Sequence, residues 1–130
     1  MNKRIVCIVD DDPIFVYGTK FLLNHNRLFV SDILVFENGK EALDSLRNLV
    51  KSKKKLPDMI FLDLNMPVMD GWEFLNNYVN LPVEPKPPII IVSSFMSTEE
   101  IERAKSYAIV TQMIVKPLSN SILAELLLKL

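Results

Sequence analysis

The sequence contains only one cysteine and one histidine among its 130 residues. Cys7 lies in a short apolar run, where a small buried side chain is far more common than a reactive thiol, because a reactive thiol needs exposure and a lowered pKa. His25 falls near the end of the first predicted helix, remote from the acidic residues described below. A surface or capping role is therefore favoured for this histidine over a chemical one.

The chain also lacks a long apolar run and an excess of charge of either sign. No apolar run approaches the ~20 residues that a membrane-spanning helix needs, and the apolar stretch near the N-terminus is too short for a signal peptide. With 15 basic and 16 acidic residues, the formal net charge is −1, whereas nucleic acids and anionic membranes call for a basic surface. We expect a cytoplasmic protein that neither inserts into membranes nor binds nucleic acid directly.

The remaining composition is that of a folded domain. Hydrophobic residues make up 49% of the sequence and charged residues 24%, without a long polar low-complexity tract, so the chain has the material for a core. Its length fits the usual ~100–200 residues of one domain. We predict a single domain over residues 1–130.

Three short apolar runs each end in polar residues that can act together. They are 5–9 before Asp10-Asp11-Asp12, 59–62 before Asp63, and 89–92 before Ser93-Ser94. Runs without polar alternation are typical of strands buried on both faces of a parallel sheet flanked by helices. Since parallel strands all end at one edge, these carboxylates and hydroxyls are expected to meet in the crevice beyond the carboxyl ends of the strands.

Helices are predicted between the strands, because residues that favour helix caps precede amphipathic segments. The predicted caps are Asp12, Asn38, Asp70, Ser97 and Ser119. The first helix is predicted from 13 to about 24, because apolar residues recur there at helical spacing. These residues are Ile14, Tyr17, Phe21 and Leu22. The fourth helix is expected to include Ala108.

The order of these elements indicates the fold class. In addition to 5–9 and 59–62, strands are predicted at 31–36, 88–92 and 112–115. Four prolines within 81–88 predict an extended connection. Five alternating strand and helix units indicate an α/β fold. We predict a doubly wound five-stranded parallel sheet that carries helices on both faces through right-handed crossovers.

The clustered carboxylates predict a bound cation. Two unit charges ~4 Å apart repel by as much as ~4 kcal/mol at an effective dielectric constant near 20. Mg²⁺ suits such a site because it takes oxygen ligands and binds through one or two carboxylates together with phosphate oxygens. Lys116, which follows the fifth strand, adds a point charge able to follow a phosphoryl group. These groups suit phosphoryl transfer, with Asp63, alone at its strand end, as the natural nucleophile.

Four segments give this sequence a specific resemblance to the receiver domain of two-component response regulators (CheY-like). They occur in the family's order and at similar intervals, and together they extend over essentially the whole chain. The segments are IVCIVDDDP (5–13), DMIFLDLNMPVMDG (58–71), PPIIIVSS (87–94) and MIVKP (113–117). The resemblance implies a flavodoxin-like fold with five helices and the strand order 2-1-3-4-5.

The resemblance implies a magnesium site and a phosphoacceptor. Asp10 and Asp11 match the pair of acids that holds Mg²⁺, and Asp11 is favoured as the direct ligand of the two. Asp63 matches the phosphoacceptor and also faces the metal. Asn65 matches the position whose backbone carbonyl completes the metal site.

Further positions match residues that contact the phosphoryl group. Ser93 matches the hydroxyl that follows this group and Lys116 the lysine that pairs with it, and a cis peptide bond is expected before Pro117. Phe95 matches a position that influences how long the phosphoryl group lasts. Met113 departs from the family, which usually has an aromatic ring there that swings inward after phosphorylation. A flexible methionine can repack, but it cannot supply that ring.

The function that the resemblance implies is that of a stand-alone response regulator receiver. It is expected to accept a phosphoryl group on Asp63 from a sensor histidine kinase or a histidine phosphotransfer protein, with Mg²⁺ as cofactor. Because the chain ends with the fifth predicted helix, no output domain is expected, and the signal is expected to leave through contacts with a downstream protein. No enzymatic activity is expected beyond its own phosphorylation and dephosphorylation.

Two alternatives stay open at this point. In a haloacid-dehalogenase-like phosphohydrolase, Asp10 would be the nucleophile and Asp12 the acid that protonates the leaving group. Ile14 then stands where such enzymes prefer Thr or Val, and the LNMPVMDG segment is unexplained. The other alternative is an interaction module with the receiver shape that is not phosphorylated, which Met113 permits but the intact set of acids disfavours.

Overall fold

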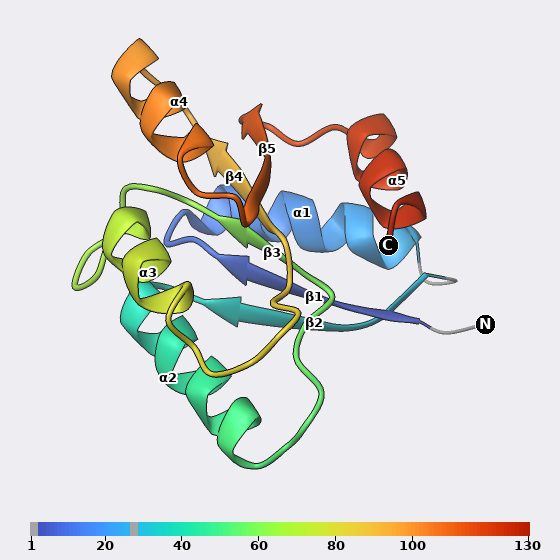
Figure 1. Ribbon diagram of the computed structural model, residues 1–130. Coiled ribbons are helices and arrows are strands. Elements are labelled where there is room, and N and C mark those ends of the chain that lie inside the picture. Colours follow the sequence, from blue (N-terminus) through green and yellow to red (C-terminus); the bar gives the residue numbers. More distant parts are fainter. Residues whose placement is uncertain (1–2, 27–28) are drawn as a thin grey trace.

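The computed structural model describes residues 3–26 and 29–130, and it shows a five-stranded parallel sheet between two layers of helices (Figure 1). The strand order is β2-β1-β3-β4-β5, as the resemblance implied. The strands are β1 (Arg4–Val9), β2 (Val30–Phe36), β3 (Met59–Leu62), β4 (Ile89–Ser93) and β5 (Val110–Val115). The helices are α1 (Pro13–His25), α2 (Gly39–Lys51), α3 (Gly71–Tyr78), α4 (Thr98–Lys105) and α5 (Asn120–Leu128).

Each face of the sheet has its own apolar cluster. On one face the strands pack against α2, α3 and α4, through residues that include Leu46, Phe74 and Ala104. On the other face they pack against α1 and α5, through residues that include Leu23 and Leu127. Strands β3 and β4 are buried along their whole length, which explains why their sequences show no polar alternation. Among the described residues, no helix has both the length and the apolar character of a membrane span.

All five helices begin at the caps that the sequence predicted. At each cap a side-chain oxygen accepts a hydrogen bond from a backbone N–H of the first turn. At Ser97 the capping box is complete, because the Glu100 side chain also accepts a hydrogen bond from the Ser97 backbone N–H. These caps fix the start of each helix close to the carboxyl edge of the sheet.

Two element boundaries differ from those predicted by two residues or more. Helix α4 ends at Lys105, so the prediction that Ala108 lies in this helix was wrong. The chain leaves the helix at Ser106, whose hydroxyl donates a hydrogen bond to the carbonyl of Arg103 at 2.6 Å. Strand β5 begins earlier than predicted, at Val110, which pairs with Ile89 of β4. Exposed Thr111 interrupts the apolar pattern, and the register of the pairing shifts there, because Gln112 pairs with Ile90.

Helix α1 exposes an apolar stripe. The side chains of Ile14, Tyr17 and Phe21 are 82%, 76% and 55% exposed. The buried residues of this helix are instead Phe15, Thr19 and Leu23. The helical spacing of the stripe therefore predicted the helix correctly, but the stripe faces solvent.

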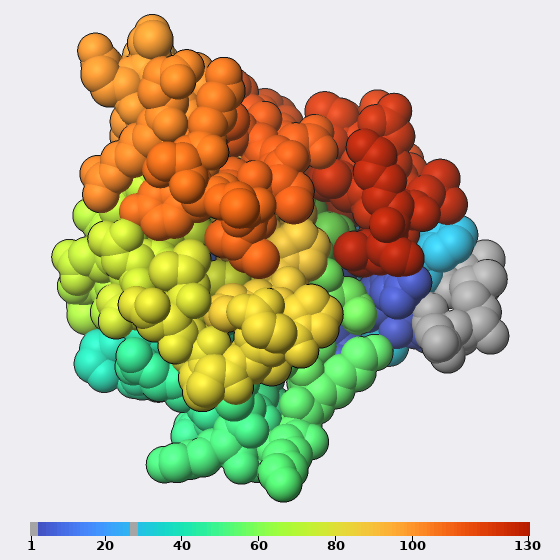
Figure 2. Space-filling model, in the orientation of Figure 1, coloured from blue at the N-terminus to red at the C-terminus, as the bar shows by residue number. Residues whose placement is uncertain are grey.

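Helix α4 packs less closely than the other helices. Only Ala104 among its residues is buried, and Figure 2 shows the helix, in orange, as a ridge that projects from the molecule. The Arg103 guanidinium lies 4.2 Å above the centre of the Trp72 ring on α3, and the Tyr107 ring lies 6.2 Å from the same ring. Trp72 thus has a packing role, and it joins α3 to α4.

Candidate functional site

Four strand ends bring polar side chains to one edge of the sheet. Asp10 follows β1, Asp63 follows β3, Ser93 ends β4 and Lys116 follows β5. Backbone hydrogen bonds continue the strand pairing into these positions. The N–H of Asp63 donates to the carbonyl of Val9 at 2.9 Å, and the N–H of Lys116 donates to the carbonyl of Ser93 at 2.9 Å. The sheet itself therefore sets the relative positions of these residues.

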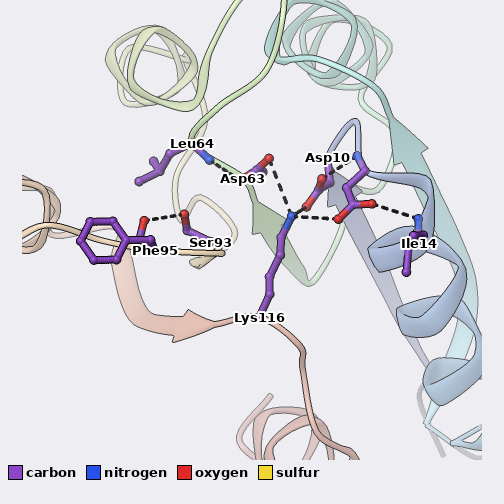
Figure 3. A network of polar contacts seen from close by, with 8 residues as sticks. Asp10, Ile14, Asp63, Leu64, Ser93, Phe95 and Lys116 are labelled. Atoms are coloured by element: carbon purple, nitrogen blue, oxygen red, sulfur yellow. Dashed lines mark hydrogen bonds and ion pairs between the residues drawn. The ribbon is translucent and has the colours of Figure 1, made fainter.

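The ammonium group of Lys116 lies among the carboxylates (Figure 3). Its Nζ is 2.9 Å from Oδ2 of Asp10, and 3.8 Å from Oδ2 of both Asp12 and Asp63. It also lies 4.7 Å from the centre of the Phe15 ring, within the range of a cation–π interaction. The lysine side chain is only 11% exposed, so carboxylates and an aromatic face replace most of its water.

Three carboxylates can reach a common ion. Asp10, Asp11 and Asp63 each offer one oxygen, and these oxygens lie within 4.8 Å of one another. Asp10 and Asp63 are buried, whereas Asp11 is exposed. Although Oδ2 of Asp10 is close to Lys116, this buried oxygen accepts no hydrogen bond of acceptable geometry from the described residues. A buried carboxylate oxygen that is paired with a single ammonium and lies beside two further carboxylates fits a hard divalent cation with oxygen ligands.

Burial makes the charge on these acids unfavourable. It raises the pKa of Asp63 to about 6, and the charge of Asp10 adds to this shift. The ammonium of Lys116 and the backbone N–H groups of Leu64 and Asn65 act in the opposite direction. Burial likewise raises the pKa of Asp10. A cation bound among the acids would relieve this repulsion.

A cavity of about 510 Å³ opens beside these groups, with Asp63, Ser93 and Lys116 in its lining. Asn65 also lines it and is exposed, while the Ser93 side chain is buried. The Ser93 hydroxyl donates a hydrogen bond to the carbonyl of Phe95 at 3.0 Å. A larger cavity of about 720 Å³ lies between α2 and α3, but it contains none of these residues. The structure therefore brings every residue of the predicted site to one edge of the sheet.

Comparison with known proteins identifies the family. Residues 6–128 match the family model of the response regulator receiver domain. The chain belongs to this family. It is 37% identical over 103 residues to a protein-glutamate methylesterase/protein-glutamine glutaminase of Caldanaerobacter subterraneus subsp. tengcongensis, which is 76% of this chain and 24% of that protein. The receiver chain thus spans about a quarter of the length of this relative.

Solved structures of receivers have the same fold. A two-component response regulator from Cytophaga hutchinsonii is 25% identical, with a TM-score of 0.86 over 98% of this chain and 97% of that one. The receiver domain of a sensor histidine kinase from Pseudomonas aeruginosa is 18% identical, with a TM-score of 0.78 over 98% of this chain and 97% of that one. The latter structure has a magnesium ion coordinated in its active site cleft. At this identity the likeness shows the fold alone.

Because the chain belongs to the receiver family, we reject the phosphohydrolase alternative. Asp12, which that alternative made an acid catalyst, caps α1 by accepting a hydrogen bond from the Ile14 N–H at 3.0 Å. The bond between Lys116 and Pro117 is cis, as the resemblance implied. Cys7 is fully buried and burial raises its pKa to about 12, which agrees with the predicted packing role.

Sequence reasoning missed a glycine that supports the position of Asp63. A Cβ atom on Gly71 would lie 2.5 Å from the carbonyl oxygen of Asp63 and 2.8 Å from Cα of Leu64. The Gly71 N–H also donates a hydrogen bond to the Leu64 carbonyl at 2.9 Å. Only a residue without a side chain allows the start of α3 to approach the end of β3 this closely. The sequence signal was a glycine directly after the helix cap Asp70.

Proposed function

We propose that this receiver domain accepts a phosphoryl group on the carboxylate of Asp63 from the phosphohistidine of a sensor histidine kinase or a histidine phosphotransfer protein. The observation that carries this proposal is the position of Asp63. Its carboxylate lies at the cavity within 3.8 Å of the Lys116 ammonium and beside the carboxylates of Asp10 and Asp11. Preorganised charges of this kind supply most of the catalysis in phosphoryl transfer.

The transfer exchanges one bond for another. A carboxylate oxygen of Asp63 attacks phosphorus, and an O–P bond forms while the N–P bond of the donor histidine breaks. The electron pair of that bond stays on the imidazole nitrogen, which takes a proton from water. The Asp63 carboxylate must be ionised to attack, and its pKa near 6 leaves it largely ionised at neutral pH.

The residues present fit Mg²⁺. In this proposal the carboxylates of Asp10, Asp11 and Asp63 hold the ion together with the backbone carbonyl of Asn65. When bound, Mg²⁺ neutralises negative charge on the phosphoryl oxygens and on the acids. The magnesium ion in the cleft of the Pseudomonas receiver supports this assignment.

The other two polar side chains contact the phosphoryl group in this proposal. The Lys116 ammonium, now shared among carboxylates, pairs with a phosphoryl oxygen, and the Ser93 hydroxyl donates a hydrogen bond to another. The added negative charge then biases a rearrangement of the loops that follow β3 and β4. A downstream protein that binds one arrangement better reads the signal.

The exposed apolar stripe of α1 suits the docking of a protein donor. A groove of about 480 Å³ adjoins the stripe and is lined by Ile14 and Gly18 on one side and by Lys116 and Leu118 on the other. A donor that covers this groove would place its phosphohistidine next to Lys116. Burial of the apolar stripe, which includes Tyr17 at 76% exposure, would contribute to binding.

Intact-mass spectrometry after incubation with Mg²⁺ and acetyl phosphate tests the proposal. The wild-type chain should gain the mass of one phosphoryl group, and the adduct should be lost on hydrolysis. Asp63→Asn should gain none. Asp70→Asn is the matched control, because it removes one acid from a helix cap outside the cluster and should be modified like the wild type. An adduct on Asp63→Asn, or none on the wild type, would refute the proposal.

A further inference from the structure

The Ser93 hydroxyl has a second acceptor besides a phosphoryl group. In the structure it donates to the backbone carbonyl of Phe95 at 3.0 Å. A serine hydroxyl has one proton to donate, and a charged phosphoryl oxygen is a stronger acceptor than a peptide carbonyl. The two acceptors therefore compete, and the Phe95 carbonyl loses its donor when Ser93 turns to the phosphoryl group.

The Phe95 side chain lies beside an apolar groove without being buried in it. The residue is 73% exposed, and Figure 3 shows its ring pointing away from Asp63. The neighbouring groove has a volume of about 350 Å³, and Met96, Met113 and Val115 line it together with Phe95 itself. An exposed aromatic ring gains free energy by entering such a groove. In this arrangement the Phe95 carbonyl accepts the hydrogen bond from Ser93 and the ring lies outside the groove.

We propose that Phe95 transmits the state of Asp63 to the groove between α4 and β5. This inference rests on the proposed function. Phosphorylation draws the Ser93 hydroxyl away, the backbone of Phe95 is released, and its ring enters the groove against Met113. Phe95 thus supplies, from the loop after β4, the aromatic ring that Met113 does not provide on β5.

Two features of the groove support this movement. Met113 is half-buried and flexible, so its thioether can adjust to an incoming ring and form a sulfur–aromatic contact. The opposite wall includes Ile101 of α4, and α4 buries only Ala104, so this wall can shift at little expense of packing. Because the ring fills the groove in one state and leaves it open in the other, a protein that binds this groove distinguishes the two states.

The test uses beryllium fluoride with Mg²⁺ as a stable mimic of the phosphoryl group, and NMR of the whole chain with labelled phenylalanine rings and methionine methyl groups. Ring signals of Phe95 and the methyl signal of Met113 are assigned with Phe95→Leu and Met113→Leu. A soluble nitroxide measures exposure of each ring. Phe21, which is 55% exposed on α1, is the internal control.

Addition of the mimic should reduce the effect of the nitroxide on the Phe95 ring severalfold and produce an NOE between this ring and the Met113 methyl, while Phe21 stays unchanged. Ser93→Ala should show the protected Phe95 ring with and without the mimic. The fluorine signal of bound beryllium fluoride reports occupancy of the site separately. Occupancy without protection of Phe95, or protection in Ser93→Ala only after the mimic is added, would overturn this inference and leave the proposed function standing. If no bound beryllium fluoride is detected, both this inference and the proposed function are overturned.

Discussion

The charge of Asp63 opposes folding when no cation is bound. Its pKa in the folded protein is about 6, whereas an unfolded aspartate has a pKa of ~3.9. Between these values the folded state binds more protons than the unfolded state, so the stabilising effect of the protonated form is lost as the pH rises through about 6. Burial of the Asp63 carboxylate thus destabilises the metal-free protein at neutral pH.

We predict that Asp63→Asn raises the free energy of unfolding by about 2 kcal/mol at about pH 7.5 in the presence of a metal chelator, and by much less at about pH 4. An amide has no charge to bury. The substitution therefore removes the free-energy cost of burying the charge only at pH values at which the carboxylate would be ionised. Urea denaturation of both proteins at the two pH values measures the difference. Equal stabilities at both pH values would contradict the assigned burial of this charge.

Val68 is a second residue that opposes folding. It lies in the loop between β3 and α3 with a φ of 66°, a conformation that is unfavourable for a β-branched side chain, and it is 75% exposed. Val68→Asn should raise the free energy of unfolding by about 1 kcal/mol, because asparagine tolerates the left-handed region. Val115→Asn is the control, since Val115 is also exposed but lies in a strand. A loss of stability in Val68→Asn, measured by urea denaturation, would count against this assignment.

At the scale of elements, two glycines in helices have opposite surroundings. A Cβ on Gly71 at the start of α3 would lie 2.5 Å from the Asp63 carbonyl oxygen, whereas a Cβ on Gly18 in α1 has no atom within 4 Å. We predict that Gly71→Ala destabilises the fold by roughly 1–3 kcal/mol and lowers the rate of phosphorylation by acetyl phosphate. Gly18→Ala should instead stabilise it by roughly 0.5–1 kcal/mol without changing that rate. Thermal unfolding measures the stability of the two variants, and the mass assay measures their rates of phosphorylation. A Gly71→Ala variant that is as stable as the wild type and is phosphorylated as fast would contradict the close approach of α3 to β3.

The strands and helix starts could be predicted from the sequence because their signals are local. A buried strand needs only a short apolar run, and a cap such as Ser97 needs only the right residue three positions before a glutamate. Features that depend on distant parts of the chain could not be predicted. Gly71 is required because of the backbone of β3, and α1 is apolar on two sides, so the spacing of Ile14 did not reveal which side is buried. The convergence of Asp10, Asp63 and Lys116 was predictable because parallel strands end at the same edge.

At the scale of the whole molecule, the cluster of acids exists only when the sheet is formed. Asp10 and Asp63 follow the neighbouring strands β1 and β3. Lys116 follows β5, a strand at the edge of the sheet, and its side chain reaches both acids. Their oxygens converge through strand pairing rather than through proximity in the sequence. A ligand that bridges these residues therefore binds the folded state and not the unfolded chain, and its binding must stabilise the entire domain.

We predict that Mg²⁺ raises the stability of the wild-type domain by about 2.7 kcal/mol when its concentration is about 100 times the dissociation constant. Asp11→Asn should lose most of this gain, because it removes one of the three carboxylates that lie within 4.8 Å of one another. Asp70→Asn should keep the full gain, since it removes the same charge from a cap where asparagine also serves. Thermal unfolding followed by circular dichroism in a series of Mg²⁺ concentrations measures the three responses. An equal response of Asp11→Asn and the wild type would place the ion away from these acids.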